Sequence, residues 1–286
     1  MSISEKLITI AENQKRVFDA GRNSGGGGGD YDSGYSDGYS SGYADGETNG
    51  WDIGYSAGWD TGYNDGQQSE YDRFWDAFQQ NGRRGGYQYA FAGTGEKDAW
   101  NDETFKPKYD MILGEGYTGS QMFWWCPASN IAETLEKQGV RLDTTRCGSM
   151  TQMFQSAFTK RVPELNCTHA MDYSNGLEYT FVNSLIETID KLIVTEALTY
   201  YAAFKNCYYL KNITFEGAIG QNIDFAESTQ LSKESIENII EHLSATASGK
   251  ALTLSSTAVT NAFGSTTASE WTSLVNSRSN WTISLV

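Results

Sequence analysis

Basic residues, histidines and long apolar runs are scarce in this sequence. Its 36 acidic residues outnumber its 21 basic residues, the formal net charge is −15, and there are two histidines. An acidic surface repels phosphate backbones, so we expect no nucleic-acid partner. No stretch reaches the roughly 18 apolar residues of a membrane span, so we expect no membrane partner. The first residues lack the basic end and apolar run of a secretory signal, which predicts synthesis in a cytoplasm.

Cysteine is equally sparse and is not spaced for metal binding. The four cysteines form no C-x-x-C pair, and the two histidines add few possible ligands. We therefore expect neither a metal nor any other cofactor. The cysteines are expected to be small, reduced core residues: Cys126, Cys147, Cys167 and Cys207.

Residues 1–20 have the pattern of one amphipathic helix. Ser2 followed by Glu5 is typical of a capping box. Five residues then alternate at spacings of four and three, with one polar position among them: Ile3, Leu7, Ile10, Gln14 and Val17. This seam fits either a helix lying on its own domain or a short coiled coil that sets the oligomer number.

Residues 21–69 contain a repeat with glycine at every fourth position. The glycines are Gly34, Gly38, Gly42, Gly46, Gly50, Gly54, Gly58, Gly62 and Gly66. An aromatic residue follows most of them, as at Tyr35, Tyr39, Tyr43, Trp51, Tyr55, Trp59 and Tyr63. On a helix such a stripe allows another backbone to approach closely along a right-handed path.

A helix built on this repeat requires a packed partner, because each glycine costs about 1 kcal/mol relative to alanine. We expect two helical arms, near residues 31–47 and 51–68, packed as a hairpin or between subunits. A flexible loop and another regular form, such as a calcium-loaded turn beginning at the glycine run 25–29, are the alternatives. The repeat resembles the GX3 repeats of certain flagellar export regulators and small adaptor proteins.

The aromatic residues within 70–145 have spacings that predict a small domain of mixed helix and strand. Aromatic residues at 71, 74, 75 and 78 have helical spacing, and those at 87, 89 and 91 alternate as in a strand. The block Phe123-Trp124-Trp125 follows. Clustered rings fill a core more often than they bind a ligand, but Trp124 and Trp125 are candidates for a sugar-binding platform.

Residues 146–286 carry a repeat with apolar anchors. Phe154, Phe181 and Phe204 anchor similar short motifs, which begin four residues earlier, and lie at intervals of 27 and 23 residues. Apolar runs near 186–194 and 210–215 predict strands after the last two anchors. Because a single coil of this kind cannot bury its apolar face, neighbouring coils are expected to stack on one another as a solenoid.

After residue 231 the period loosens. Ser232 predicts a capped helix whose buried face includes Ile236, Ile239 and Ile240. A strand at 251–254, a short helix around Trp271 and a final strand at 281–286 are expected to close the solenoid.

The segment 204–215, Phe-Lys-Asn-Cys-Tyr-Tyr-Leu-Lys-Asn-Ile-Thr-Phe, resembles the repeat of leucine-rich surface proteins of the BspA-like type. Residues 1–20, 71–78, 105–109 and 211–285 are similar to structural proteins of prophages and tailed phages of gut Firmicutes, with the glycine repeat as an insertion. The resemblance implies an α+β chain that ends in an irregular leucine-rich-repeat-like α/β solenoid. It also implies a location in the virion.

Familiar catalytic motifs are absent from the sequence. It has no Walker loop, no G-x-S-x-G and no H-E-x-x-H. Cys147 or Cys167 with His169 is the only nucleophile pair the spacing suggests, and no orienting acid accompanies it. We therefore expect a non-enzymatic structural or adhesion protein of a phage tail or appendage. It would associate with itself and with other virion proteins, and bind a bacterial surface glycan or protein.

Two other functions remain open. One is a bacterial cell-surface adhesin of the same repeat class. The other is a glycan-active enzyme that uses Trp124, Trp125 and nearby carboxylates. The acidic pair Asp98 and Asp102, however, fits a solvated face better than a glycosidase site.

Overall fold

The computed structural model describes residues 90–92, 100–102, 105–116 and 119–286. These belong to one compact unit, Gly85–Val286. The N-terminal helix predicted for 1–20, the glycine repeat predicted for 21–69 and the helix predicted for 71–78 lie outside the described residues. The unit combines four helices and nine strands in the described part of the chain, which agrees with the α+β class.

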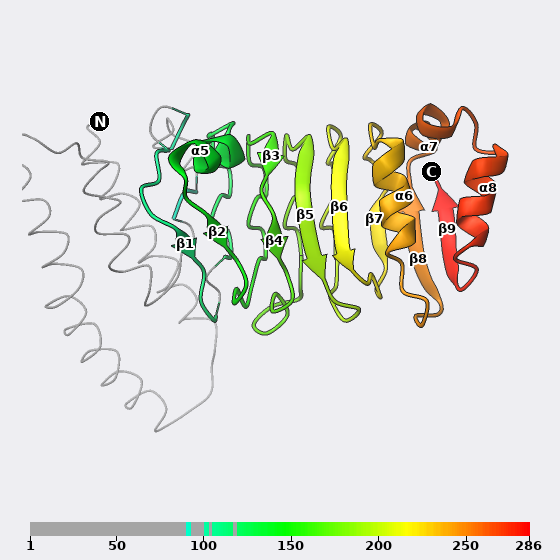
Figure 1. Cartoon of the computed structure of the whole chain (residues 1–286), viewed down its shortest axis with the longest axis horizontal. Helices are drawn as coiled ribbons and strands as arrows, with labels where there is room; N and C mark the ends of the chain where they lie inside the picture. The colour runs from blue at the N-terminus through cyan, green and yellow to red at the C-terminus, as the bar shows by residue number, and fades with distance from the viewer. Residues whose placement is uncertain (1–89, 93–99, 103–104, 117–118) are drawn as a thin grey trace, which may run out of the picture. The chain divides into compact units, whose positions relative to one another are not determined.

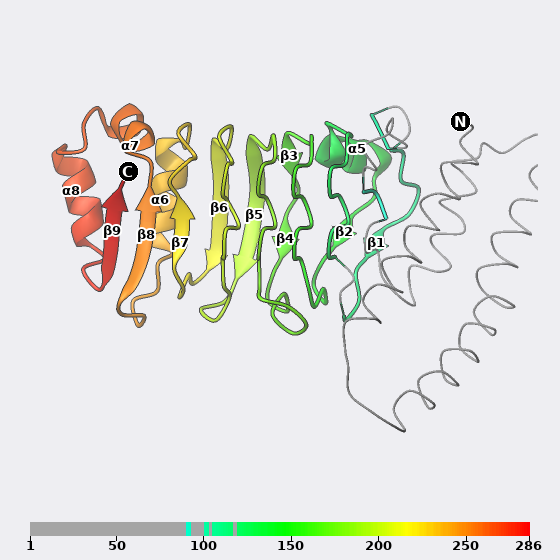
Figure 2. The same cartoon turned by 180° about the vertical axis from the view of Figure 1, so that it is seen from behind.

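The strands form parallel sheets in a row that follows chain order (Figure 1). β1 (Met111–Ile112) pairs with β2 (Leu142–Asp143). β3 (Arg161–Val162) and β4 (Leu165–Asn166) both pair with β5 (Thr188–Val194), which pairs with β6 (Asn212–Gly217). β7 (Ile223–Phe225), β8 (Lys250–Leu254) and β9 (Trp281–Leu285) form the last sheet. Figure 2 shows the same row from behind.

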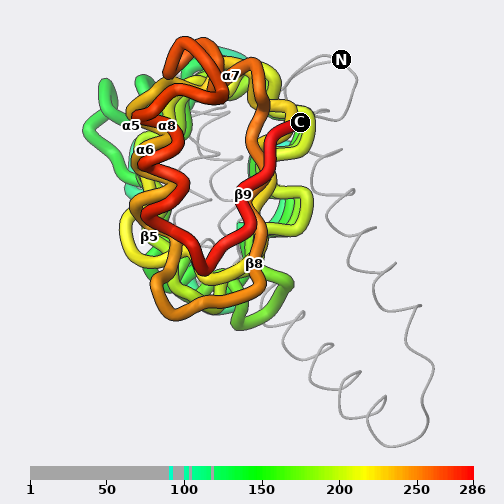
Figure 3. The backbone as a smooth tube through the Cα atoms, turned by 90° about the vertical axis from the view of Figure 1, so that its right-hand side faces the viewer, coloured from blue at the N-terminus to red at the C-terminus, as the bar shows by residue number. Residues whose placement is uncertain are grey.

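Four helices accompany the strands: α5 (Ile131–Gln138), α6 (Lys233–Glu241), α7 (Ser256–Phe263) and α8 (Ser269–Asn276). Seen along the row, α6 and α8 lie on the same side as β5, and β8 and β9 lie on the opposite side (Figure 3). The Ser232 hydroxyl caps α6 by accepting the Ser235 N–H, and Ile236, Ile239 and Ile240 are buried. The two helices and two strands predicted after residue 231 are confirmed as α6, α8, β8 and β9.

Six phenylalanine rings form a continuous column through the core. Successive rings are stacked with centroids 4.5–6.0 Å apart, in the order Phe91, Phe123, Phe154, Phe181, Phe204 and Phe225. All six are essentially inaccessible to solvent. The three predicted anchors are its middle members. The boundary predicted at residue 145 falls inside this unit, because the Phe123 and Phe154 rings stack across it.

Four of these phenylalanines sit at the centre of a repeated turn. The residues two before and two after Phe123, Phe154, Phe181 and Phe204 have left-handed φ values of 49–58°. These positions hold Gln121, Trp125, Gln152, Ser156, Tyr179, Asn183, Ala202 and Asn206. We call the segments 119–127, 150–158, 177–185 and 200–208 the anchor turns.

Backbone hydrogen bonds join each anchor turn to the next. Phe123, Phe154 and Phe181 donate their N–H groups to Met153, Thr180 and Ala203, and the left-handed residues beside them donate in the same way. The intervening amides bond three residues back within their own turn, as Gln155 does to Gln152. Each turn therefore satisfies its backbone through alternate local and inter-turn bonds.

The row of anchor turns ends at a carboxylate. In the first three turns the equivalent N–H group donates to the following turn. In the last turn the Asn206 N–H donates instead to the Glu227 Oε2 at 2.6 Å. At the edge of β6, side chains likewise take the place of a neighbouring strand. The Ile213 and Phe215 N–H groups donate to the side chains of Ser235 and Asn238 on α6. Side chains thus replace backbone partners where the regular pairing stops.

Candidate functional site

The anchor turns expose large apolar side chains on a surface that is almost free of charge. Charged residues are 20% of the chain, but the four nine-residue turns contain only Glu178 and Lys205. We call this surface the turn wall. Its most exposed large residues are Trp125 (48%), Phe158 (43%), Leu185 (39%), Tyr201 (63%) and Tyr208 (50%).

The aromatic block at 123–125 is divided between core and surface. Phe123 is buried in the ring column, whereas Trp125 is about half exposed at a left-handed φ of 54°. Trp124 is half-buried, and its indole Nε1 has no hydrogen-bond partner among the described residues. The core interpretation therefore fits Phe123, and Trp125 is available to a ligand.

Side-chain amides connect neighbouring turns on the same wall. The Gln121 Nε2 donates to the Gln152 Oε1 at 2.9 Å, and the Gln152 Nε2 donates to the Gln155 Oε1 at 2.5 Å. The amides of Asn183 and Asn206 also hydrogen-bond, at 2.7 Å. An amide has two donor hydrogens and an acceptor oxygen with two lone pairs, so each retains hydrogen-bonding capacity.

A tyrosine pair extends the wall beyond these amides. The rings of Tyr179 and Tyr201 meet edge to face, with centroids 5.3 Å apart. Further along each turn, Phe158 donates its N–H to Cys126, and Leu185 donates its N–H to Ala157. Both occupy the fourth position after an anchor phenylalanine, as does Tyr208, so the three share one row.

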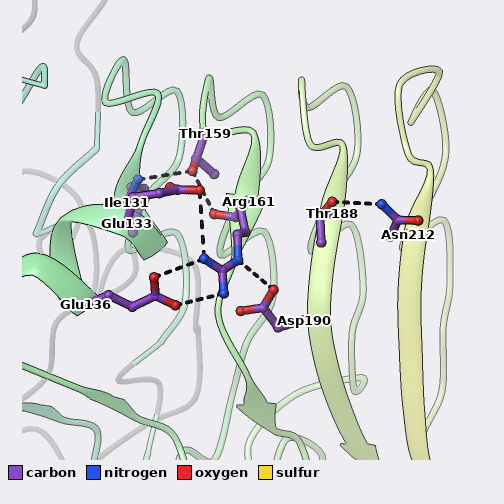
Figure 4. A network of polar contacts seen from close by, with 8 residues as sticks. All are labelled: Ile131, Glu133, Glu136, Thr159, Arg161, Thr188, Asp190 and Asn212. Atoms are coloured by element: carbon purple, nitrogen blue, oxygen red, sulfur yellow. Dashed lines mark hydrogen bonds and ion pairs between the residues drawn. The ribbon is translucent and has the colours of Figure 1, made fainter.

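The strand side of the molecule is different, because its charges are engaged with one another (Figure 4). Arg161 on β3 bonds Asp190 on β5 and Glu136 on α5, both at 2.7 Å. These hydrogen bonds, with Asp190 the stronger influence, raise the pKa of Arg161 above its usual value. The guanidinium thus holds a helix and two strands together.

Other contacts in the same region also run between neighbouring strands. Lys191 lies 3.1 Å from Glu164 and 3.0 Å from Glu216, and Arg141 lies 2.8 Å from Asp110. The Asn212 amide donates to the Thr188 hydroxyl at 3.3 Å. The charged groups of the strand side therefore stabilise the packing of neighbouring strands against one another.

The cysteines confirm the prediction that they are reduced core residues. All four are buried thiols. Burial raises the pKa of Cys207 to about 12 and that of Cys167 further still. His169, by contrast, is exposed and lies 3.0 Å from Asp172. A neutral, buried Cys167 thiol and an exposed His169 do not form an activated nucleophile pair.

The carboxylate Asp102, which we expect on a solvated face, is exposed and makes structural contacts. It accepts hydrogen bonds from the Ser129 and Asn130 N–H groups and from the Ser129 hydroxyl. Asp98 lies outside the described residues. Among the described residues there is no group of three or more metal-ligating side chains, and no helix long and apolar enough to cross a membrane.

The proposed packing residues of the N-terminal region, from Ile3 to Val17 and from Gly34 to Gly66, all lie outside the described residues. Of the predicted packing and ligand-binding residues, the structure therefore places Trp124 and Trp125 alone. It adds Gln121, Gln152, Phe158 and Tyr201, which sequence reasoning missed. Gln121 and Gln152 each precede an anchor phenylalanine by two residues, and Phe158 follows one by four residues.

No family model, curated protein or solved structure matches the chain.

Proposed function

We propose that residues 90–286 form an irregular solenoid of the leucine-rich-repeat type. From residue 119 to residue 217 its coils would each contain one anchor turn and the strand or strands that follow it, whereas β7, β8 and β9 follow without an anchor turn. The parallel pairing of successive strands, the ring column and the hydrogen bonds between anchor turns support this proposal. Such a stack buries apolar surface between similar units, which makes it a scaffold for presenting an outer face.

We infer that the protein is a non-enzymatic structural and adhesion component of a phage virion, located in the tail or an appendage. The observation that supports adhesion best is the turn wall, where large apolar side chains are exposed on a regularly bonded backbone. Exposed apolar surface of this kind is typical of interaction sites.

The N-terminal region would join subunits and connect the protein to other virion proteins. The seam containing Leu7 and Ile10 and the four-residue glycine period support this part of the proposal. Replacing Leu7 and Ile10 together with aspartate should convert a defined oligomer into monomers in light scattering. The off-seam variant Lys6→Gln should leave the oligomer intact.

The location is tested by mass spectrometry of phage particles purified from the strain that encodes the chain. We expect its peptides at a fixed ratio to the tail proteins. Peptides found on the bacterial envelope but missing from the particles would contradict a virion location and favour the cell-surface adhesin.

A further inference from the structure

The turn wall has the chemistry of a surface for an uncharged ligand. It contains one acidic and one basic residue, although the whole chain has a net charge of −15. A polyanion such as nucleic acid or an acidic polysaccharide would require several cations, and Lys205 is the only one on these turns. The opposite side of the molecule uses its charges in pairs such as Arg161 with Asp190.

The exposed groups on the wall combine flat apolar faces with amides. Trp125, Phe158 and Tyr201 offer rings whose faces can cover the apolar face of a sugar. Gln121 and Gln152, on the first two turns, bond each other and can also donate to and accept from hydroxyl groups. This combination of aromatic rings and neutral amides suits a ligand that carries many hydroxyls and no charge.

Two kinds of group recur along the direction in which the turns follow one another. Gln121 and Gln152 lie two residues before an anchor phenylalanine, and Phe158, Leu185 and Tyr208 lie four residues after one. The Trp125 N–H donates to Gln155 in the next turn at 2.9 Å, and the Phe158 N–H donates back to Cys126, also at 2.9 Å. These bonds fix Trp125 and Phe158 on adjacent turns. A linear polymer laid along the turns would meet amides on the first two turns and large apolar side chains on the last three, which adds affinity through multiple contacts.

We propose that the turn wall is the adhesive site and that it binds a neutral polysaccharide lying along the anchor turns. The proposal rests on the adhesive function proposed above and names the ligand class for it. Trp125, Phe158, Tyr201 and Tyr208 stack against sugar rings, and Gln121, Gln152 and Asn183 bond the hydroxyls. Because the contacts are uncharged, binding is insensitive to salt.

The experiment is native gel electrophoresis of the full chain through gels that contain an uncharged polysaccharide. Dextran, glycogen, galactomannan and a linear β-glucan are the neutral probes, and hyaluronan is the charged one. We expect retardation by at least one neutral probe, unchanged between low and high sodium chloride, and none by hyaluronan.

The matched variants are Trp125→Gly with Tyr201→Ala, and Ile112→Ala as the control. Glycine is chosen at 125 because the left-handed backbone there suits it. The double variant should weaken retardation about tenfold or more. Ile112 is 49% exposed on β1, away from the anchor turns, so its replacement should have no effect. Unchanged thermal unfolding shows that the variants are folded.

Three outcomes of the gel experiment would overturn the proposal: no retardation by any neutral probe, equal retardation of the double variant, or a preference for hyaluronan. Concentration-dependent self-association that the double variant abolishes would also overturn it, by assigning the wall to a contact between copies. Adsorption of the full chain to host cells is measured in parallel. Adsorption that survives the double variant would leave the adhesive function standing and reject this site.

Discussion

Eight left-handed residues in the anchor turns carry side chains where glycine would be the usual choice. Such a backbone costs about 1–2 kcal/mol at a non-glycine residue. Here the N–H groups of these residues in the first three turns bond the following turn, as at Gln152 and Ser156. The inter-turn hydrogen bonds offset the strain, and they leave side chains such as Trp125 on the surface.

One glycine is required for a close approach between strands. Gly217 ends β6 with a φ of +92°, and a Cβ added there would lie 2.2 Å from the Val194 carbonyl oxygen. Gly217→Ala should therefore lower the free energy of unfolding by about 3 kcal/mol in urea titration.

Gly249→Ala is the matched control for this change. Gly249 also has a positive φ, +67°, but an added Cβ there meets no atom within 4 Å. Its replacement should cost only about 1 kcal/mol, the backbone strain itself. Equal losses at the two positions would show that contact with Val194 does not matter.

The ring column makes a second prediction for single residues. Phe154 lies between Phe123 at 5.0 Å and Phe181 at 6.0 Å and is fully buried. Phe154→Ala should destabilise the protein by about 3–5 kcal/mol, by loss of buried area and formation of a cavity. The control Phe158→Ala removes a ring that is 43% exposed and should lower the urea midpoint far less.

At the scale of elements, helix α6 completes the sheet of β5 and β6. The Asn238 Oδ1 accepts the Phe215 N–H at 2.7 Å, and the Ser235 hydroxyl accepts the Ile213 N–H at 2.9 Å. Asn238→Ala should leave the Phe215 amide unsatisfied and cost about 1–3 kcal/mol.

Asn238→Asp keeps an acceptor oxygen at the same position and should preserve most of the stability. Hydrogen exchange of the Phe215 amide is the specific measurement. It should accelerate in the alanine variant and remain slow in the aspartate variant. Unchanged exchange in both would mean that α6 does not protect the edge of β6.

Helices and strands were predicted correctly from the sequence where the apolar residues were regularly spaced or a capping residue was present. The intervals Phe154–Phe181 and Phe181–Phe204 are similar, so their relation was visible, and the cap at Ser232 identified α6. Phe91, Phe123 and Phe225 belong to the same column but lie at other intervals. Because the connections between turns vary in length, the sequence does not reveal that these residues are related. Because the left-handed positions hold ordinary residues, no glycine signal revealed the turns either.

The candidate site was only partly predictable for a related reason. Trp124 and Trp125 were identified as an aromatic cluster, but the partners of Trp125 come from later turns. Gln155 and Phe158 become its neighbours through inter-turn hydrogen bonds, which no local pattern in the sequence reveals.

At the scale of the whole molecule, carboxylates that accept hydrogen bonds make the free energy of unfolding decrease at acid pH. The pKa of Asp110 is lowered mainly by its hydrogen bonds with Arg141, that of Asp143 by Thr145, and that of Glu196 by Ser244 and Thr246. A lowered folded-state pKa contributes stability above the ordinary pKa of the group. That contribution is lost as the pH falls through the folded value.

The urea midpoint should therefore be constant near neutral pH and fall below about pH 4. The double variant Asp110→Asn, Glu196→Gln should show a lower midpoint at neutral pH and a shallower decline in acid. An acid decline as steep as that of the unmodified protein would assign the pH dependence to other groups.

The central claim is that the anchor turns are bonded to one another as regularly as the strands are. Amide hydrogen exchange of the full chain tests it most directly, at Phe123, Phe154 and Phe181, whose N–H groups bond the next turn, and at Leu192 and Ile193 in β5. We predict that the turn amides exchange as slowly as the strand amides and lose protection together with them in urea. Fast exchange at the three phenylalanines beside a protected β5 would contradict the claim.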